Sequence, residues 1–313
     1  MSPNLRYKKC HVIIGRIIPG PKKPQNVESF LFPGFHHVSV LAKKGLDIWD
    51  AALNRSFKSR VFILLGLADG LGLVYLNGLA GHSGAYGCRL YCPVQGRCKL
   101  DGGNHYYPAH FKPHNYAVIG CDHDNVSVKQ LPIGNPLEYQ KALNQVLSLR
   151  TKTEYQENRK ATGVSRPSLF SRFPQDHVFA VLLCFGDDIM HLISLNIPDL
   201  LINLWCGSFD CDPQDNKRTC DWAVLQGDTW ENHGQCVAVA TPYLPGSFDR
   251  PPQNPAEKIS SRYKAWEFLT YVYGLGPALL YGILPDKYWT SFCKLVVGVR
   301  LLHQRKISKE QLI

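Results

Sequence analysis

Residues 60–70 read Arg-Val-Phe-Ile-Leu-Leu-Gly-Leu-Ala-Asp-Gly, a nearly continuous apolar run that ends in an acidic residue and a glycine. Such a run suits a β-strand that is covered on both faces, as in a sheet flanked by helices. A carboxylate at the carboxyl end of a buried strand lies where α/β sheets hold ligands and metals, so Asp69 is a candidate site residue. The Asp-Gly dipeptide is also common in turns, and taken alone it favours a turn.

Strand and helix patterns flank this run on both sides. Residues 10–18 are rich in β-branched side chains and predict a strand. Helices are predicted over 27–52 (interrupted near Pro33-Gly34), 136–162 (ending at Gly163), 188–205 (divided or kinked at Pro198), 220–240, 259–280 and 286–303. The pattern as a whole predicts an α/β fold.

Composition points to a partner before any motif does. The 313 residues carry a net charge of +10. Phosphate attracts a basic surface, so nucleic acid is the first partner to consider, although such an excess can equally serve solubility. The opening residues lack the apolar region of a secretory signal, and no apolar run is long enough to span a membrane. Eleven cysteines in such a chain indicate reduced thiols or a metal site rather than a disulfide framework.

Cysteine and histidine gather in a segment, residues 81–124, that is also rich in glycine and proline. Cys88, Cys92, Cys98 and His105 lie at short spacing where little core is expected, and thiolates with imidazole suit a structural Zn²⁺. His191 could supply the fourth ligand in place of His105. The alternative is unliganded thiols that pack as small hydrophobic groups.

Two further sites have acidic residues. Glu267 lies inside an apolar helix, where a carboxylate needs a partner, a cation or exposure. Asp188 and His191 fall on one helical face and can share a proton or a metal, but taken alone Asp188 (or Asp187) is better explained as a helix N-cap. A basic run near the C-terminus can touch phosphate, although a solvated helix end is the default interpretation; it comprises Arg300, His303, Arg305, Lys306 and Lys309.

These signals occur together in one order along the chain. In this order the chain resembles the CACTA (En/Spm-like) DNA transposases, especially the branch found in fungal genomes. The blocks that carry the resemblance are IPGPK (18–22), LADG (67–70), GAYGCRLYCP (84–93), HYYP (105–108), DIMHL (188–192), LPGSFDRPP (244–252) and KAWEF (264–268). They extend over essentially the whole chain.

The resemblance implies an incomplete RNase H-like core of the D-D-E transposase and integrase type, with a large, mostly helical insertion. It places the second and third catalytic acidic residues at Asp69 and Glu267, as ligands of Mg²⁺ or Mn²⁺. Two such ions would activate the attacking group and stabilise the leaving oxygen in DNA cleavage and strand transfer. The family's first catalytic aspartate lies on a strand upstream of a segment like Pro3–Lys8, and this strand is expected to be missing here.

The expected divisions are 1–80 for the first part of the core, 81–125 for the zinc loop, 126–240 for the insertion with the Asp-x-x-His motif, 241–258 for a proline-rich linker and 259–313 for the last core helices. The implied partners are DNA and other transposase subunits, in the nucleus. The chain is then a transposase catalytic-region fragment that is itself inactive. The alternatives are a non-catalytic DNA- or protein-binding module and a remnant that does not fold stably.

Overall fold

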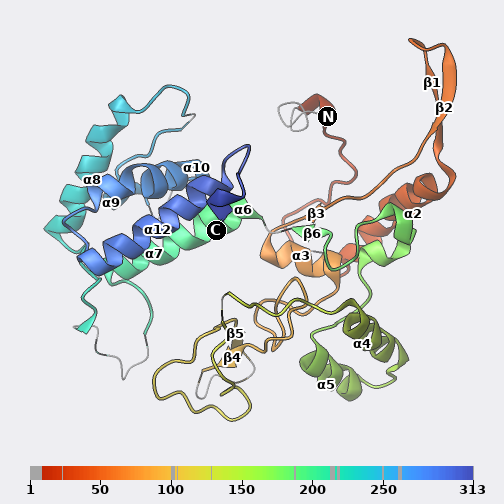
Figure 1. The fold of residues 1–313 in the computed structure, drawn as a ribbon, viewed down its shortest axis with the longest axis horizontal. Helices are drawn as coiled ribbons and strands as arrows, with labels where there is room; N and C mark the ends of the chain where they lie inside the picture. Colours follow the sequence, from red (N-terminus) through yellow and green to blue (C-terminus); the bar gives the residue numbers. More distant parts are fainter. Residues whose placement is uncertain are drawn as a thin grey trace. The chain divides into compact units, whose positions relative to one another are not determined.

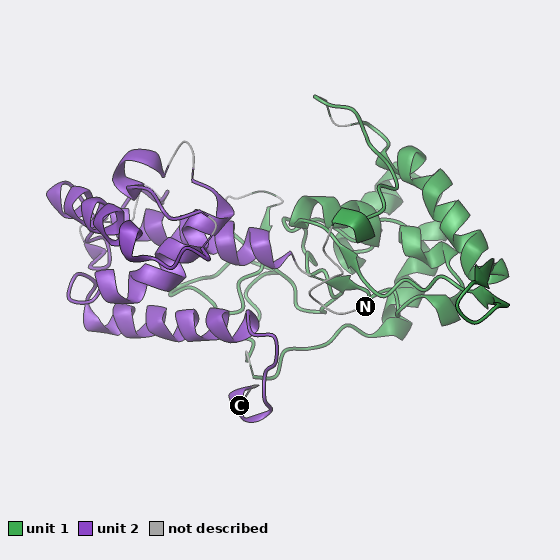
Figure 2. Cartoon of the chain, turned by 90° about the horizontal axis from the view of Figure 1, so that it is seen from above, with its two compact units in different colours: residues 1–187 green, residues 188–313 purple. Residues whose placement is uncertain are grey.

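Two units make up the chain in the computed structural model, residues 1–187 and residues 188–313 (Figure 2). The structure describes residues 9–22, 24–99, 103, 105–127, 129–186, 188–211, 216, 219–248, 250–259 and 263–312. The division falls inside the segment 126–240, which the sequence predicts as one insertion. The first two helices of that segment therefore belong to unit 1.

Unit 1 combines helices with short strands (Figure 1). Its helices are η1 (Lys9–His11), α2 (Val27–Lys44), α3 (Gly70–Asn77), α4 (Pro136–Ser148), α5 (Lys152–Thr162), η2 (Leu169–Arg172) and η3 (Gln175–His177). Its strands are β1 (Leu46–Asp50), β2 (Arg55–Ser59), β3 (Gly66–Leu67), β4 (Arg97–Cys98), β5 (Tyr106–Tyr107) and β6 (Phe185–Gly186). They pair as antiparallel β1–β2, parallel β3–β6 and antiparallel β4–β5, so the described part of unit 1 has no sheet of more than two strands.

The apolar run of residues 60–68 does not form the long buried strand that its sequence predicts. Ile63 makes one bridge to Val178, and only β3 pairs with a strand, β6. Phe62 is 58 % and Leu65 60 % exposed. A strand buries both faces only where neighbours cover them, and among the described residues one short strand lies beside it. The strand predicted for residues 10–18 is likewise absent, because no described strand pairs with that segment.

Helix α2 begins at Val27, as predicted, but it continues through Pro33 and ends at Lys44, before the predicted residue 52. It begins where the Asn26 side chain accepts a hydrogen bond from the Ser29 N–H (3.2 Å), and Pro33 does not interrupt it. The ring of Phe35 packs on the rings of Phe170 and Phe173 of unit 1, which holds the helix beyond the proline. Gly45 ends the helix at a φ of 75°, a conformation that favours glycine, and residues 46–59 form the β1–β2 hairpin in place of the predicted helix.

The region 136–162 is two helices rather than one. Leu149 is extended after α4, and the Thr151 side chain then caps α5 by accepting a hydrogen bond from the Glu154 N–H (3.2 Å). The Glu154 carboxylate accepts one from the Thr151 N–H in return (3.1 Å), which completes a capping box. Gly163 ends α5 in a left-handed conformation, as predicted.

Unit 2 consists of helices and the segments that connect them, with no strand among its described residues. Its helices are α6 (Ile189–His191), η4 (Leu192–Asn196), α7 (Ile197–Cys206), α8 (Asp228–Ala240), η6 (Thr241–Tyr243), α9 (Pro255–Lys258), α10 (Ala265–Phe268), η7 (Leu269–Leu275), α11 (Gly276–Leu279), α12 (Asp286–Leu302) and η8 (Glu310–Leu312). η4 and η7 are π-helical turns that join the α-helices on either side of them. One core cluster serves the unit, and in it Trp205 meets Phe292 edge to face, with ring centroids 5.1 Å apart.

Pro198 does not divide the helix that begins at residue 189. It lies in the first turn of α7, directly after the π turn, where the Ile197 N–H donates to the Leu192 carbonyl. In the π pattern the Ile193 carbonyl would accept from residue 198, but proline has no N–H. The Tyr273 hydroxyl donates to that carbonyl instead (2.8 Å), so a tertiary contact replaces the missing helical bond.

The joined helix Ile189–Cys206 is 18 residues long with a mean hydropathy of 1.4, which is enough to cross a membrane by length and composition. The sequence predicts no apolar run long enough to span a membrane, whereas this helix is long and apolar enough to do so. A core helix passes the same test, and here Ile193, Ile202 and Trp205 are buried in the core of unit 2.

A buried histidine makes the stability of unit 2 dependent on pH. His233 lies on α8, and its Nε2 is 2.9 Å from the hydroxyl of Tyr271. Burial lowers the pKa of His233 to about 4. Between about pH 4 and about 6.5, the ordinary value, the unfolded chain binds a proton that the folded chain does not, so the free energy of unfolding falls as the pH falls through this window.

We expect His233→Gln, which keeps a polar group near the Tyr271 hydroxyl, to remove this dependence. The wild type should lose on the order of 3 kcal/mol of stability between pH 7 and pH 4 through this residue. Urea unfolding followed by tryptophan fluorescence measures it, since five of the six tryptophans lie in unit 2. His303→Gln, an exposed control, should keep the wild-type profile. Equal profiles for His233→Gln and wild type would contradict the assignment.

Candidate functional site

Glu267 is buried completely, with 0 % of its surface exposed. Its Oε1 accepts a hydrogen bond from the Gln253 side chain (2.9 Å), and its Oε2 accepts one from the Lys264 N–H (3.0 Å). The guanidinium of Arg250 forms an ion pair with Oε2 at 2.9 Å. The sequence predicts that this carboxylate needs a partner or a cation, and it has both.

Local sequence accounts for part of this arrangement. Lys264 precedes α10, and Glu267 is the third residue of the helix, from which a glutamate side chain reaches back to the free N–H of the capping residue. Arg250 and Gln253 come from the proline-rich segment before α9, and no pattern in the sequence pairs them with Glu267. The blocks 244–252 and 264–268, both quoted for the family resemblance, therefore meet at one ion pair.

The surroundings of Glu267 fit an ion pair and do not fit a divalent metal ion. Both carboxylate oxygens already accept hydrogen bonds, and a guanidinium occupies the position where a cation would bind. Burial, and then the negative charge of Glu267, raise the pKa of the neighbouring Tyr263. A Mg²⁺ ligated by Glu267 would have to displace Arg250 and break hydrogen bonds that hold the helix start.

Asp69 lies two residues after the end of β3, close to the position that the sequence predicts for a site residue. It also acts as the N-cap of α3, because its side chain accepts a hydrogen bond from the Gly72 N–H. Asp69-Gly70 therefore begins a helix rather than the turn that the dipeptide favours, and a metal role for Asp69 stays a prediction. Asp69 belongs to unit 1 and Glu267 to unit 2.

Asp188 and His191 do meet, as their spacing predicts. The Asp188 carboxylate caps α6 by accepting from the His191 N–H (3.2 Å), and its other oxygen lies 2.6 Å from the His191 Nδ1. Burial raises the pKa of Asp188, but the hydrogen bonds from His191 outweigh burial and leave that pKa below its ordinary value. The N-cap and a hydrogen bond between the two side chains are thus both present, while Asp187, the other predicted cap, lies outside the described residues.

The four predicted zinc ligands are not brought together. Cys88 and Cys92 are neighbours, and burial raises the pKa of the Cys92 thiol. Cys98 is buried in a different cluster, against Tyr106 and Cys121. No group of three or more His, Cys, Asp or Glu in the described residues is placed to hold a metal ion.

The strand that contains Tyr106 explains why His105 is separate. Neighbouring residues of an extended segment point to opposite faces, so Tyr106 enters the cluster and His105 stays exposed beside Tyr107, with ring centroids 4.6 Å apart. Cys121, the thiol next to Cys98, was not among the predicted ligands. A zinc requirement stays a prediction.

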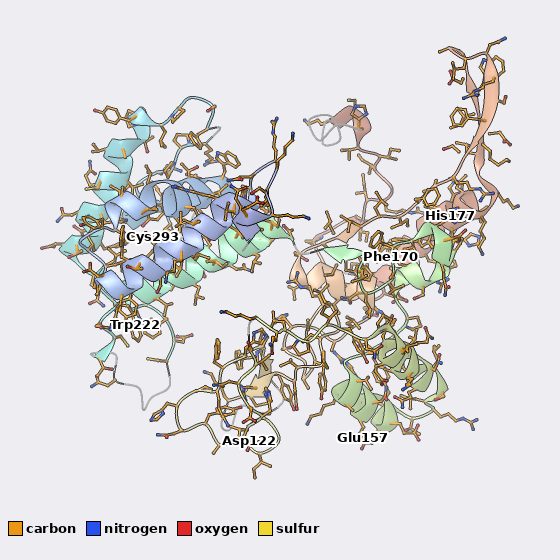
Figure 3. The ribbon with its side chains drawn as sticks, viewed as in Figure 1. Asp122, Glu157, Phe170, His177, Trp222 and Cys293 are labelled. Atoms are coloured by element: carbon orange, nitrogen blue, oxygen red, sulfur yellow. The ribbon has the colours of Figure 1, made fainter. Side chains whose placement is uncertain are left out.

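A buried arginine holds the Cys- and His-rich region instead. Arg97 is 2 % exposed, and its guanidinium donates to the carbonyls of Ala109 (3.1 Å), Cys121 (2.8 Å), His123 (2.8 Å) and Asp124 (3.2 Å). These carbonyls lie in the loop where Figure 3 labels Asp122. A guanidinium presents five N–H donors in a fixed fork, so it can order a loop that has little apolar core.

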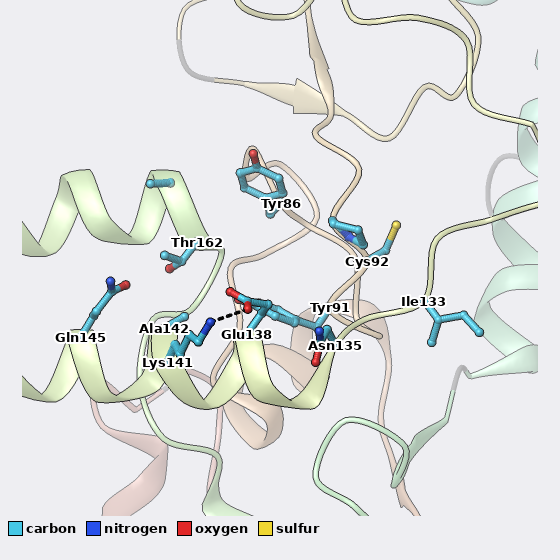
Figure 4. A pocket seen from close by; sticks show the side chains of 12 residues that line it. Tyr86, Tyr91, Cys92, Ile133, Asn135, Glu138, Lys141, Ala142, Gln145 and Thr162 are labelled. Carbon is cyan, nitrogen blue, oxygen red and sulfur yellow. Dashed lines mark hydrogen bonds and ion pairs between the residues drawn. The ribbon is translucent and has the colours of Figure 1, made fainter.

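A cavity of about 380 Å³ lies beside this region, between residues 86–93 and α4 (Figure 4). Tyr86, Tyr91 and Cys92 line one side of it, and Glu138 and Lys141 line the other. Lys141 forms an ion pair with Glu138 at 2.8 Å. Its charged groups are therefore paired with each other, which leaves little charge for a ligand.

Comparison of the chain with models of known protein families, with curated proteins and with solved structures found no match in any of the three. The resemblance to CACTA transposases therefore rests on the quoted sequence blocks. The Arg250–Glu267 ion pair supplies a structural reason for two of these blocks to occur together.

Replacement of Glu267 tests its structural role against a metal role. We expect Glu267→Ala to lower the free energy of unfolding by about 3 kcal/mol, because buried donors lose their acceptor and Arg250 its partner. Glu231→Ala, at an exposed position of α8, should change it little. Millimolar Mg²⁺ should not raise the wild-type unfolding midpoint. Stabilisation by Mg²⁺ that Glu267→Ala abolishes would show a metal site here.

Replacement of Arg97 tests what orders the Cys- and His-rich region. Lysine cannot reproduce the fork of donors, so Arg97→Lys should lose at least one hydrogen bond to a charged group. This loss should lower the stability of the region against local opening by at least about 1.5 kcal/mol. Amide hydrogen exchange in residues 95–125 should then become about tenfold faster. Exposed Arg150→Lys is the matched control. A chelator should leave exchange unchanged, and faster exchange with chelator would instead support the zinc prediction.

Proposed function

We propose that this chain is a DNA-binding protein of transposase type, similar to the catalytic region of CACTA elements, that holds DNA without cutting it. The observation that carries the proposal is the engagement of Glu267 with Arg250, Gln253 and the Lys264 N–H. The acidic residue that would complete a catalytic site contributes to the fold of unit 2 instead.

The charge of the chain supports the part of the proposal that concerns DNA binding. The chain has 35 Lys and Arg against 25 Asp and Glu. Not every residue of the predicted basic run is available, because Arg300 donates to the carbonyls of Tyr273 (2.8 Å) and Gly274 (3.4 Å). Arg305, Lys306 and Lys309 follow the end of α12 and are exposed, so they can approach phosphate.

The chemistry around Glu267 supports the part of the proposal that the chain does not cut DNA. Phosphodiester cleavage and strand transfer by this class of enzyme need two divalent ions, with carboxylate oxygens free to bind them. The described arrangement around Glu267 offers no free oxygen. A reaction through Glu267 would first require Arg250 to leave, and that would leave a buried charge without a partner.

We expect the purified chain to bind duplex DNA of unrelated sequences with similar affinity. Each phosphate that the protein neutralises releases a counterion, so log K should fall linearly with log salt, at a slope of about −0.9 per phosphate. Fluorescence anisotropy over a salt series measures this slope. Absence of binding at low salt, or binding that salt does not weaken, would contradict the DNA-binding proposal.

A strand-cleavage and strand-transfer assay with Mg²⁺ and with Mn²⁺ tests the other half. No product is expected. Metal-dependent activity that Asp69→Ala and Glu267→Ala each abolish would overturn the proposal that the chain holds DNA without cutting it, and would restore the catalytic roles that the resemblance implies.

A further inference from the structure

A second cavity of unit 1 differs in chemistry from the one in Figure 4. It measures about 440 Å³ and lies between the glycine-rich segment 80–85 and the last turn of α5. Arg159 and Lys160 line it from α5, Ser83 lines it from the loop and Tyr106 from β5. None of the described residues that line it is acidic.

Neither cation of this cavity has an anionic partner among the residues that the structure describes. Across the described ranges of the chain, no carboxylate forms an ion pair with Arg159 or Lys160. Glu157, labelled on α5 in Figure 3, is the nearest acidic residue in sequence, and none of the ion pairs of the described residues includes it. The Lys160 ammonium lies 6.0 Å from the centre of the Tyr106 ring. This cavity therefore offers unpaired positive charge, whereas Lys141 of the other cavity is neutralised by Glu138.

Backbone hydrogen bonds fix the walls of this cavity relative to each other. The Ala80 N–H donates to the carbonyl of Gly163 at the end of α5 (2.7 Å), and the Tyr106 N–H donates to the carbonyl of Ser83 (3.0 Å). A Cβ on Gly163 would lie 2.7 Å from the Cβ of Tyr86, so the loop can approach the helix end only where residue 163 is glycine. The backbone of the loop and of the helix end is thus held in place before any ligand binds, while the side chains of Arg159 and Lys160 are exposed.

The loop itself is folded tightly. A Cβ on Gly84 would lie 2.9 Å from the Cβ of Ala80, and a Cβ on Gly87 would lie 2.8 Å from the Gly81 carbonyl oxygen. Glycine at these positions is a steric requirement of the fold. Because glycine has no side chain, the backbone on the loop side of the cavity is left uncovered, and a charged group can approach it, as in phosphate-binding loops.

The dipole of α5 does not cancel the positive charge. The C-terminus of a helix carries about half of a negative charge. Arg159 and Lys160 together contribute two positive charges at the same end, so the field in the cavity attracts an anion. The planar guanidinium of Arg159 matches two phosphate oxygens, and Lys160 adds a point charge.

We propose that this cavity binds a phosphate group of the nucleic-acid backbone, with Arg159 and Lys160 as its charged ligands and Ser83 as a hydroxyl donor. The proposal rests on the DNA-binding function above and names a contact point in unit 1. A volume of about 440 Å³ admits a phosphate with its neighbouring sugar.

The test compares two double variants that remove the same charge from the two ends of one helix. Arg159→Ala/Lys160→Ala removes both positive charges from the lining of the cavity, and Arg150→Ala/Lys152→Ala removes two exposed cations at or just before the start of α5. The probe is a duplex oligonucleotide of about 20 base pairs, followed by fluorescence anisotropy over a salt series. We expect the cavity variant to bind about tenfold or more weakly and its salt slope to fall by about 1, while the control pair changes affinity by about threefold at most.

The exchange Arg159→Lys/Lys160→Arg should restore most of the affinity, because it keeps both charges, and all variants should show wild-type circular dichroism. If wild type binds DNA but the cavity variant and the control variant lose equal affinity and slope, the cavity proposal is overturned and the DNA-binding function stands. If wild type does not bind DNA, both proposals fail.

Discussion

The buried carboxylate of Glu267 is the constraint on which unit 2 depends. Removal of an ionised group from water costs several kcal/mol, and only an opposite charge and complete hydrogen bonding offset that cost. Arg250, Gln253 and the Lys264 N–H supply both. Since two of these partners lie 14 and 17 residues before Glu267, the carboxylate fixes the path of the proline-rich segment against the start of α10.

Other parts of unit 2 follow from that path. Asn254 begins α9, and a Cβ on Gly234 of α8 would lie 2.2 Å from the Asn254 side-chain oxygen, so α8 can approach only because residue 234 is glycine. The π turns add a second set of tertiary bonds. Tyr273 of one turn satisfies the Ile193 carbonyl of the other, and Arg300 satisfies the carbonyl of Tyr273 itself. Arg300 belongs to the basic run that the sequence offers for phosphate contact, and in the structure it binds backbone carbonyls instead.

Unit 1 is organised differently, because its buried apolar residues form three separate clusters in the described part of the chain. Where apolar packing is thin, polar groups order the backbone. Arg97 holds four carbonyls of the Cys- and His-rich loop, and hydrogen bonds to Gly163 and Ser83 hold the glycine-rich loop. Arg159 and Lys160, which form no ion pair with a described carboxylate, line the cavity beside this loop, and this is the chemical basis of the proposed phosphate contact.

Local sequence determined the features that depend on a few neighbouring residues. The glycine stop of α5, the Asp188–His191 pair and the cap at Asp69 all follow from side chains within four positions of each other. Tertiary structure decided the rest, because burial and pairing depend on residues far apart. The run 60–68 is apolar enough for a buried strand, yet burial requires neighbours that sequence alone does not supply. The partners of Glu267, Cys98 and Arg97 come from other segments of the chain, so the ion pair of Glu267, the cluster around Cys98 and the carbonyls bound by Arg97 could not be predicted from local spacing.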